Sequence, residues 1–343
     1  MNRTRSDNLL RTARFVAVLL LFAIPVVYLG IQRNYGVLQF AQLALDGLRG
    51  GAIYALIAMG FVMVFNVTGI INFAQGAFVM LGGMLTVTFY QMESSLPDRL
   101  HLIASAVLAV IITALIGLLI ERLTIYPARK SSTLTLIIIT VGVYIAMQGL
   151  GLLVWGAKAY VFPAFTTLAM TDHVFRWFGL VIKAQSFWIW GSMILVLVLL
   201  AYFFERTLLG KAMRACSVNR HGARLVGIGA ERMSLLAFGM AAAVGAIGGI
   251  VVSPILRPSY DMGLSLGLKG FVAAILGGLV STPGAVLGGL LLGFLENVAA
   301  GVTKAGMKDI YAFILLILTL LFRPQGLLGV GKTAVESSSE DQG

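Results

Sequence analysis

The sequence predicts an all-α integral membrane protein, and three observations carry that prediction. Hydrophobic residues make up 59% of the 343 residues and charged residues only 11%, a balance far from that of soluble domains. Apolar stretches approach the length of about 20 residues that a helix needs to cross a bilayer, and they recur from residue 13 to residue 322. The polar segments between them are too short to form a separate soluble domain.

About ten helices, with eight as the lower limit, are expected to cross the membrane. They cover residues 13–31, 41–65, 70–90, 102–120, 134–155, 186–204, 233–255, 265–280, 284–301 and 308–322. Glycines and short turns blur the edges of the third helix and of the last three. The predicted organisation is a tail over residues 1–12, one membrane domain over residues 13–322 with a long polar loop at 207–233, and a tail over residues 323–343.

The distribution of positive charge predicts the orientation of these helices. Cytoplasmic loops of membrane proteins carry an excess of lysine and arginine. The N-terminal tail, every second loop after it and the C-terminal tail hold 15 of the 25 such residues, with the densest group between residues 206 and 232. Both termini are therefore predicted to be cytoplasmic. The net charge of +11 follows this loop asymmetry, so we expect no nucleic acid partner.

Few residues are suited to metal or redox chemistry. Cys216 is the single cysteine, so the chain forms no internal disulfide, and no Cys/His cluster has the spacing of metal ligands. His101, His173 and His221 are predicted to lie in different loops, two outside and one inside. A membrane enzyme would need convergent acids, bases or metal ligands. We therefore expect neither a catalytic residue nor a bound metal.

One motif near the C-terminus matches a nucleotide-binding pattern. Residues 326–333 read GLLGVGKT, which fits the G-x-x-x-x-G-K-[ST] pattern of a phosphate-binding loop. Such a loop needs a strand before it and a helix after it whose N-terminus faces the phosphates. Here a membrane helix precedes the motif and a short polar tail follows. The chain is expected to bind no cofactor, and any ATP and magnesium would be held by partner subunits.

The loop at residues 207–233 is too polar to cross a bilayer and too apolar for a simple linker. Apolar residues alternate there with arginines, Asn219 is of a type that caps helices, and Gly227 is of a type that ends them. The sequence thus predicts a short amphipathic helix that begins near Arg220. Two explanations fit this helix equally well: docking into a groove of a partner protein, and binding to the lipid surface through its arginines.

A second group of polar residues interrupts the apolar sequence of the predicted second and third helices. Asn72, Gln75 and Gly76 have the spacing i, i+3 and i+4, so on a helix they would share one face. Asn66 lies close by, toward the predicted cytoplasmic end of the preceding helix. Polar groups that face lipid without a partner are costly. These residues are expected either to form hydrogen bonds between helices or to line the route of a transported solute.

Four segments of the chain resemble one family of membrane proteins. They are GGAIYALIAMGFVMVFNVTGIINFAQGAFVMLGGM at residues 50–84, KAMRACSVNRHGARLVGI at 211–228, GFVAAILGGLVSTPGAVLGGLLLG at 270–293 and RPQGLLG at 323–329. In this order they resemble the permease subunits of bacterial ABC importers of the branched-chain amino acid type. The resemblance implies a multi-pass transport subunit of the bacterial cytoplasmic (inner) membrane that is not itself an enzyme.

The same resemblance implies a docking segment and a set of partners. The loop resembles the segment that docks on the ATP-binding subunit, and the implied docking residues are Arg214, Arg220, His221, Ala223, Arg224, Leu225, Gly227 and Ile228. His221 and Gly222 stand where the general docking motif has an acidic start. The implied partners are a second permease subunit, two ATP-binding subunits, membrane lipid and a periplasmic solute-binding protein that delivers branched-chain amino acids or another small polar solute.

An ion-gradient-driven secondary carrier of small solutes is the alternative function. Such carriers place ionisable groups near the middle of the bilayer. Asp46 and Arg49 are spaced for a local ion pair on one helix, and both Lys269 and Glu296 are expected near outer ends of their helices. No pair of central carboxylates is therefore predicted, which favours a subunit driven by partner chains.

Overall fold

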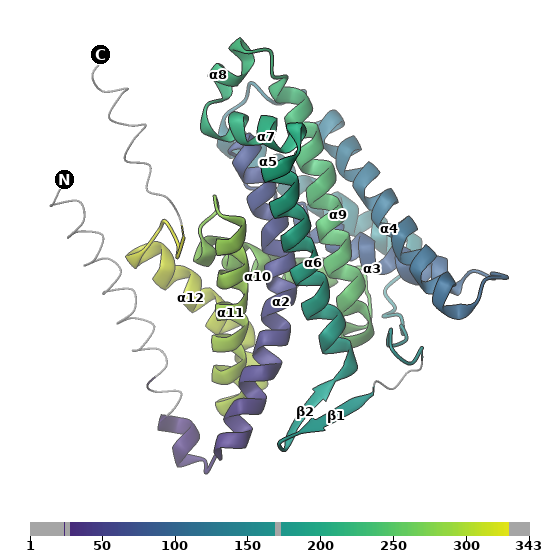
Figure 1. Ribbon diagram of the computed structural model, residues 1–343, viewed down its shortest axis with the longest axis vertical. Coiled ribbons are helices and arrows are strands. Elements are labelled where there is room, and N and C mark those ends of the chain that lie inside the picture. Colours follow the sequence, from purple (N-terminus) through teal and green to yellow (C-terminus); the bar gives the residue numbers. More distant parts are fainter. Residues whose placement is uncertain (1–23, 25–27, 169–172, 329–343) are drawn as a thin grey trace.

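The computed structural model describes residues 24, 28–168 and 173–328, and within them the chain forms a bundle of helices (Figure 1). The helices are α2 (Val37–Thr68), α3 (Gln75–Gln91), α4 (Asp98–Ile120), α5 (Thr133–Trp155), α6 (Ala184–Arg206), α7 (Leu208–Val218), α8 (Arg220–Leu225), α9 (Ala230–Leu256), α10 (Met262–Gly277), α11 (Thr282–Val302) and α12 (Lys308–Phe322). A π-helical turn (Glu121–Ile125) extends α4, and a 3-10 turn (Ala305–Met307) precedes α12. An antiparallel hairpin of β1 (Val174–Trp177) and β2 (Leu180–Lys183) departs from the predicted all-α architecture.

Six of the described helices are long and apolar enough to cross a bilayer: α2, α4 with its π turn, α5, α6, α9 and α11. Three more helices are apolar but shorter. α3 has 17 residues, α10 has 16 and α12 has 15. Of the predicted helix at residues 13–31, only residues 24 and 28–31 lie within the described residues. The other helices begin and end within a few residues of the prediction, except that the third begins at Gln75 and not at residue 70.

The two ends of the bundle carry different structures. α7 and α8 project from one end, and the β1–β2 hairpin lies at the other (Figure 1). We refer to these as the α8 end and the hairpin end. α2 begins at the hairpin end, whereas α9 begins at the α8 end directly after α8, so these two central helices run in opposite directions.

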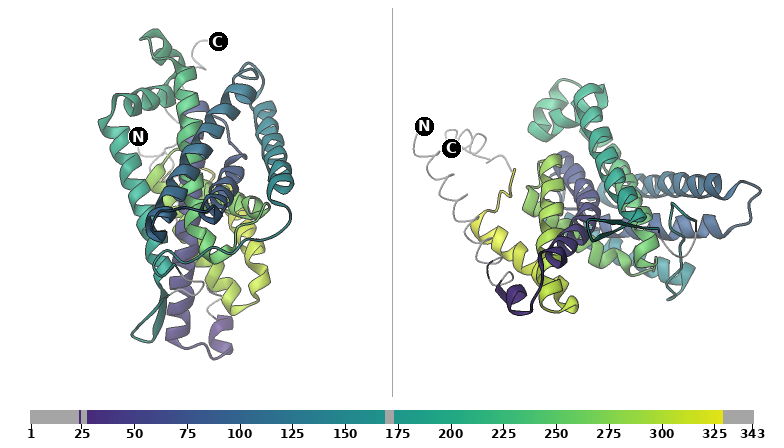
Figure 2. Two further views of the ribbon diagram at one scale, coloured as in Figure 1. Left: turned by 90° about the vertical axis from the view of Figure 1, so that its right-hand side faces the viewer. Right: turned by 60° about the horizontal axis from the view of Figure 1, so that its bottom comes forward.

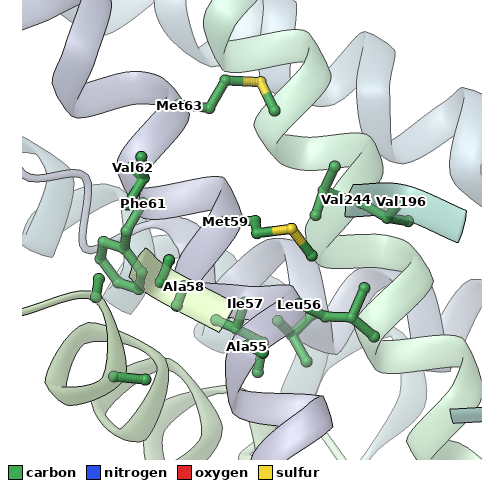
Figure 3. Close-up of a cluster of buried hydrophobic side chains, with 14 of the residues drawn as sticks. Ala55, Leu56, Ile57, Ala58, Met59, Phe61, Val62, Met63, Val196 and Val244 are labelled. Carbon is green, nitrogen blue, oxygen red and sulfur yellow. The ribbon is translucent and has the colours of Figure 1, made fainter. Parts of the chain in front are cut away.

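α2, α9 and α11 form the centre of the bundle. Within the most apolar 18-residue stretch of each of these helices, 83%, 72% and 67% of the residues are buried. The corresponding shares for α4, α5 and α6 are 28%, 17% and 22%. Figure 3 shows the apolar side chains of α2 from Ala55 to Met63, with Val196 of α6 and Val244 of α9 in the same buried cluster. The outer helices expose leucine, isoleucine and valine instead, as expected where lipid replaces water as the solvent.

Glycines set the closest approach between central helices. A Cβ added at Gly47 would meet the carbonyl oxygen of Gly293 at 2.7 Å, and one at Gly51 would meet that of Gly289 at 2.7 Å. Because lipid provides little hydrophobic drive for helix association, small residues that allow close backbone packing take its place. This packing explains why the segment at residues 270–293 is rich in glycine.

Two short helices, α3 and α10, begin inside the bundle after the chain reverses at opposite ends. α2 ends at Gly69, which adopts a left-handed conformation with φ of +74°, and residues 69–74 return toward the interior. α9 ends at the hairpin end, and residues 257–261 return from there. Non-helical backbone at membrane depth is tolerated only where protein or a water-filled cavity surrounds it. Gln75 to Met84 of α3 and most of α10 are buried, as this requires. The far end of α3 reaches one edge of the bundle, where a loop joins it to α4 (Figure 2, right).

The segment after α12 does not leave the bundle at once. The amides of Leu327 and Leu328 donate to the carbonyl oxygens of Leu276 and Gly277 at 2.8 and 3.0 Å, across the end of α10. The tail predicted from residue 323 is therefore packed against the bundle as far as Leu328. The remainder of the motif at residues 329–333 lies outside the described residues.

Candidate functional site

Two short helices, and not the single one predicted, form the loop at the α8 end. Thr207 caps α7, since its hydroxyl accepts from the amide of Gly210 at 3.0 Å. Asn219 caps α8 in the same way, since its side-chain oxygen accepts from the amide of Gly222 at 2.8 Å. Gly227, with φ of +84°, ends α8. The cap and the terminating glycine of α8 are both as predicted.

One face of this helix pair packs on the bundle. Met213, Cys216 and Ala223 are buried, and α7 contacts α6, α2 and α9. Burial raises the pKa of the Cys216 thiol, against the opposing effect of Arg220 and Arg224. A thiol kept neutral in this way is a packing group and not a nucleophile.

The opposite face of the helix pair is exposed and apolar at its tip. Leu225 is 89% exposed and Val226 is 76% exposed. Next to them, α7 and α8 enclose a shallow groove of about 480 Å³. Its lining residues are Lys211, Arg214, Ala215, Val218, Asn219, Gly222, Ala223 and Val226. Exposed apolar residues rimmed by charged ones are typical of a surface that contacts another macromolecule.

Arg220 faces the bundle, unlike the exposed residues among those predicted to dock. Its side chain lines a cavity of about 190 Å³ with Glu121 of the π turn, Glu231 and Ser234 of α9, and its Nε is buried without a partner among the described residues. Arg129 forms an ion pair with Glu231 at the rim of the same cavity. Arg220 thus places α8 beside the π turn that follows α4 and beside α9.

The predicted docking residues therefore separate into two sets. Arg214, His221, Arg224, Leu225 and Gly227 are exposed, and Ile228 is half-buried. Ala223 is buried and Arg220 is directed inward. A partner at this end could reach the first set directly and would act on the second only by moving α8.

The polar residues near α3 are not arranged as predicted. Asn72 precedes α3 and does not share a helix face with Gln75 and Gly76. Its side-chain oxygen accepts from the amide of Ala74 at 3.1 Å, so it organises the start of α3. An asparagine three residues before a glutamine is a known signal for a helix N-terminus, and it could have located this boundary.

Gln75 and Gly76 lie in the middle of the bundle and not at its end. The side chain of Gln75 is fully buried and donates to the carbonyl oxygen of Ala241 in α9 at 3.0 Å. It occupies the space left by Gly60 and Gly245. Asn66 remains at the end of α2, where it donates to the carbonyl oxygen of Val280 at 3.2 Å. A hydrogen bond between helices thus accounts for Gln75, while Asn66 bonds to the loop between α10 and α11.

A buried ionic cluster was missed by sequence reasoning. Lys269 is in the middle of α10, not near its outer end, and its Nζ lies 2.8 Å from a carboxylate oxygen of Glu296 in α11 and 2.8 Å from one of Asp309 in α12. Tyr54 donates to Glu296 at 3.3 Å. Lys269 and Glu296 are 8% and 2% exposed. These partners are far apart in sequence, so no local spacing indicates them.

The prediction for Asp46 and Arg49 is confirmed. Their side chains form an ion pair within one helix at 3.2 Å, and both are partly exposed. The two ion-pair systems therefore differ, because only Lys269 and Glu296 are withdrawn from solvent.

The apolar bundle and its exposed surface helices define a multi-pass membrane protein, and comparison with known proteins identifies its family. The family model described as "Branched-chain amino acid transport system / permease component" matches residues 43–320. The chain belongs to this family of permeases, as the four sequence segments indicated.

Curated relatives agree with the family match. The chain is 36% identical over 300 residues to the high-affinity branched-chain amino acid transport system permease protein BraD of Pseudomonas aeruginosa, covering 85% of this chain and 96% of that protein. It is 33% identical over 299 residues to the permease protein LivH of Escherichia coli K12, with the same coverage. A shorter match, 29% over 153 residues and 42% of each chain, is to the nucleoside ABC transporter permease protein NupB of Lactococcus lactis.

Proposed function

We propose that this chain is the membrane-spanning permease subunit of an ABC importer and forms the translocation pathway for branched-chain amino acids or a related small polar solute. The observation that carries the proposal is the family match over residues 43–320. In this proposal the chain works in the bacterial cytoplasmic membrane, and a second permease, two ATP-binding subunits and a periplasmic binding protein complete the importer. ATP and magnesium belong to the ATP-binding subunits.

In the proposal the α8 end is cytoplasmic and docks on an ATP-binding subunit. The dense group of arginines between residues 206 and 232 supports this orientation. The exposed tip at Leu225 and Val226 supports docking on a protein groove. Arg220 is a positioning residue here, because its inward side chain would transmit movement of α8 to Glu121 and α9.

The pathway assignment concerns the polar group near α3. Asn72, Gln75 and Gly76 lie between α2, α9 and α10, three helices that must shift relative to one another if access alternates between the two sides. Asn66 stands at the α8 end of the same region. Their present hydrogen bonds are compatible with a role in the pathway, since the same groups can exchange partners when helices move.

Co-purification tests the docking proposal directly. The chain is extracted from its native membrane in mild detergent, and co-purifying chains are identified by mass spectrometry, for the natural protein and for Leu225→Asp. We expect ATP-binding subunits with the natural chain and at least a tenfold loss of them with the variant, as for a central apolar contact worth about 2 kcal/mol. Phe178→Asp is the matched control, because Phe178 is 83% exposed at the hairpin end.

Two outcomes would contradict the proposal. Equal recovery of ATP-binding subunits with Leu225→Asp would remove the docking assignment. A chain that purifies alone and transports solute in sealed vesicles without ATP would replace the importer by the ion-gradient-driven carrier.

A further inference from the structure

The first turns of α3 and α10 meet inside the bundle. A Cβ placed on Gly76 would run into the carbonyl oxygen of Gly263, and one on Gly263 would run into that of Gly76. A Cβ on Gly267 would lie 2.9 Å from the Cα of Gly76. The adjacent Gln75 bonds to Ala241, which is close to the midpoint of α9. Two helix N-termini thus converge near the middle of the membrane-spanning region.

Convergent N-termini create a local positive potential. Each helix carries about half a positive charge at its N-terminus. In α3 the amides of Gln75, Ala77 and Phe78 donate to the carbonyl oxygens of Asn72 and Ala74, so they contribute to this charge but are not open donors. α3 has no acidic residue in its first turn. α10 begins after Asp261, whose carboxylate accepts from the hydroxyl of Ser259 at 2.6 Å. The positive end of α10 is therefore partly offset, and that of α3 is not.

Unsatisfied hydrogen-bond donors lie at the same place. The side-chain Nδ2 of Asn72 and the hydroxyl of Tyr144 are buried and have no partner among the described residues. Asn72 lies three residues before the first residue of α3, and the ring of Tyr144 lies 3.3 Å from the Cβ position of Gly76. Buried donors without acceptors are costly, and each one calls for an explanation. A hydrogen-bond acceptor that is bound there only part of the time would explain these unpaired donors.

An apolar wall adjoins these donors. Phe73, next to Asn72, packs its ring 5.1 Å from that of Phe271 in α10 and 6.4 Å from that of Phe61 in α2. A site that combines anion-binding donors, a nearby carboxylate and an aromatic surface has the three features that a zwitterionic amino acid with an aliphatic side chain would use.

We propose that the meeting point of α3 and α10 binds the α-carboxylate of an amino acid during its passage, through the side chains of Asn72 and Tyr144 beside the positive end of α3. Asp261 receives the α-ammonium group, and the aromatic wall faces the side chain. This proposal rests on the proposed function and names the chemistry of its pathway. Because Gly76 and Gly263 are in contact here, the structure represents the closed state of this site, and separation of the two turns admits the solute.

The test uses the complete importer reconstituted in proteoliposomes with its loaded binding protein, and measures ATP-driven uptake of radiolabelled leucine together with ATP hydrolysis. Tyr144→Phe removes one hydroxyl that has no partner in the closed state, so the fold should be retained. Asn72→Asp places a negative charge where the carboxylate would bind. We expect uptake to fall about tenfold for Tyr144→Phe, the effect of one hydrogen bond to a charged group, and further for Asn72→Asp. ATP hydrolysis stimulated by the binding protein should stay within about twofold in both.

Thr113→Val is the matched control. Thr113 also carries a buried hydroxyl without a partner among the described residues, but it lies on α4, away from α10. Uptake by this variant should equal that of the natural protein. If Tyr144→Phe imports leucine at the natural rate, the carboxylate site is wrong while the importer assignment stands. If the natural complex imports no amino acid with ATP, both proposals are overturned.

Discussion

The loop at the α8 end and the meeting point of α3 and α10 depend on different kinds of interaction. α8 is defined by a cap and a terminating glycine within nine residues of one another, Asn219 and Gly227. The start of α3 is defined by groups from three other helices, because Gln75 bonds to α9, Gly76 packs on α10, and the amide of Phe73 donates to the hydroxyl of Thr140 in α5 at 3.1 Å. A surface element can therefore be changed locally, whereas a change in the centre displaces several helices.

The largest effect in the centre is expected from Lys269→Met. This variant leaves Glu296 buried without its cation, and breaking a buried ion pair costs about 3–5 kcal/mol. The melting temperature of the purified chain in detergent should fall by roughly 10 °C. The double variant Lys269→Met with Glu296→Leu should regain most of the loss, since the remaining carboxylate of the cluster, Asp309, is more than half exposed and no buried charge is left unpaired.

Arg49→Met is the matched control for this prediction. Arg49 belongs to a partly exposed pair with Asp46, and such pairs contribute about 0–1 kcal/mol. Equal melting temperatures for Lys269→Met and Arg49→Met would show that the central cluster is no more sensitive than the surface.

A smaller effect is expected from Gly249→Ala. An added Cβ would run into the carbonyl oxygen of Val79, so α9 and α3 would have to separate at a cost of about 1–3 kcal/mol. Gly142→Ala is the control, because its Cβ would meet no atom within 4 Å and alanine favours a helix by about 0.5–1 kcal/mol over glycine. Thermal unfolding of both variants measures the difference, and opposite signs are expected. A stabilised Gly249→Ala would mean that the central contact is loose.

The smallest effect is expected from Asn219→Ala in the loop. Loss of the cap should weaken α8 by about 1 kcal/mol without lowering the melting temperature of the bundle. ATP-driven uptake in proteoliposomes should fall about fivefold, because fewer molecules present a formed α8 to the partner. A fall in the melting temperature as large as that of Gly249→Ala would contradict the separation of the two regions.

The sequence predicts those features that depend on neighbouring residues. The lengths of the apolar stretches predict ten helices, and nine of these are found within the described residues. The capping asparagine and the terminating glycine predict both ends of α8. The prediction places residues 70–74 in the third helix, because Ile70, Ile71 and Phe73 continue the apolar pattern, whereas α3 begins at Gln75. The deciding partner, Thr140, is 67 residues away from Phe73.

The candidate sites follow the same rule. The exposure of Leu225 could be expected from the sequence, because an apolar side chain in a polar loop stands out from its neighbours. The inward direction of Arg220 and the pairing of Lys269 could not be identified, since both depend on cavities and carboxylates supplied by distant helices. Charge alone does not reveal whether a residue faces lipid, solvent or protein.

The convergence of α3 and α10 has a consequence for the leakage of ions across the membrane. An importer must let its solute pass without letting protons and sodium ions flow down the gradients that the cell maintains. The positive end of α3, in contact with the start of α10 near the middle of the bundle, opposes the entry of a lone cation. A solute that carries a negative group of its own would lower this barrier only for itself. The same geometry would therefore admit a zwitterion and keep lone cations from crossing the bilayer.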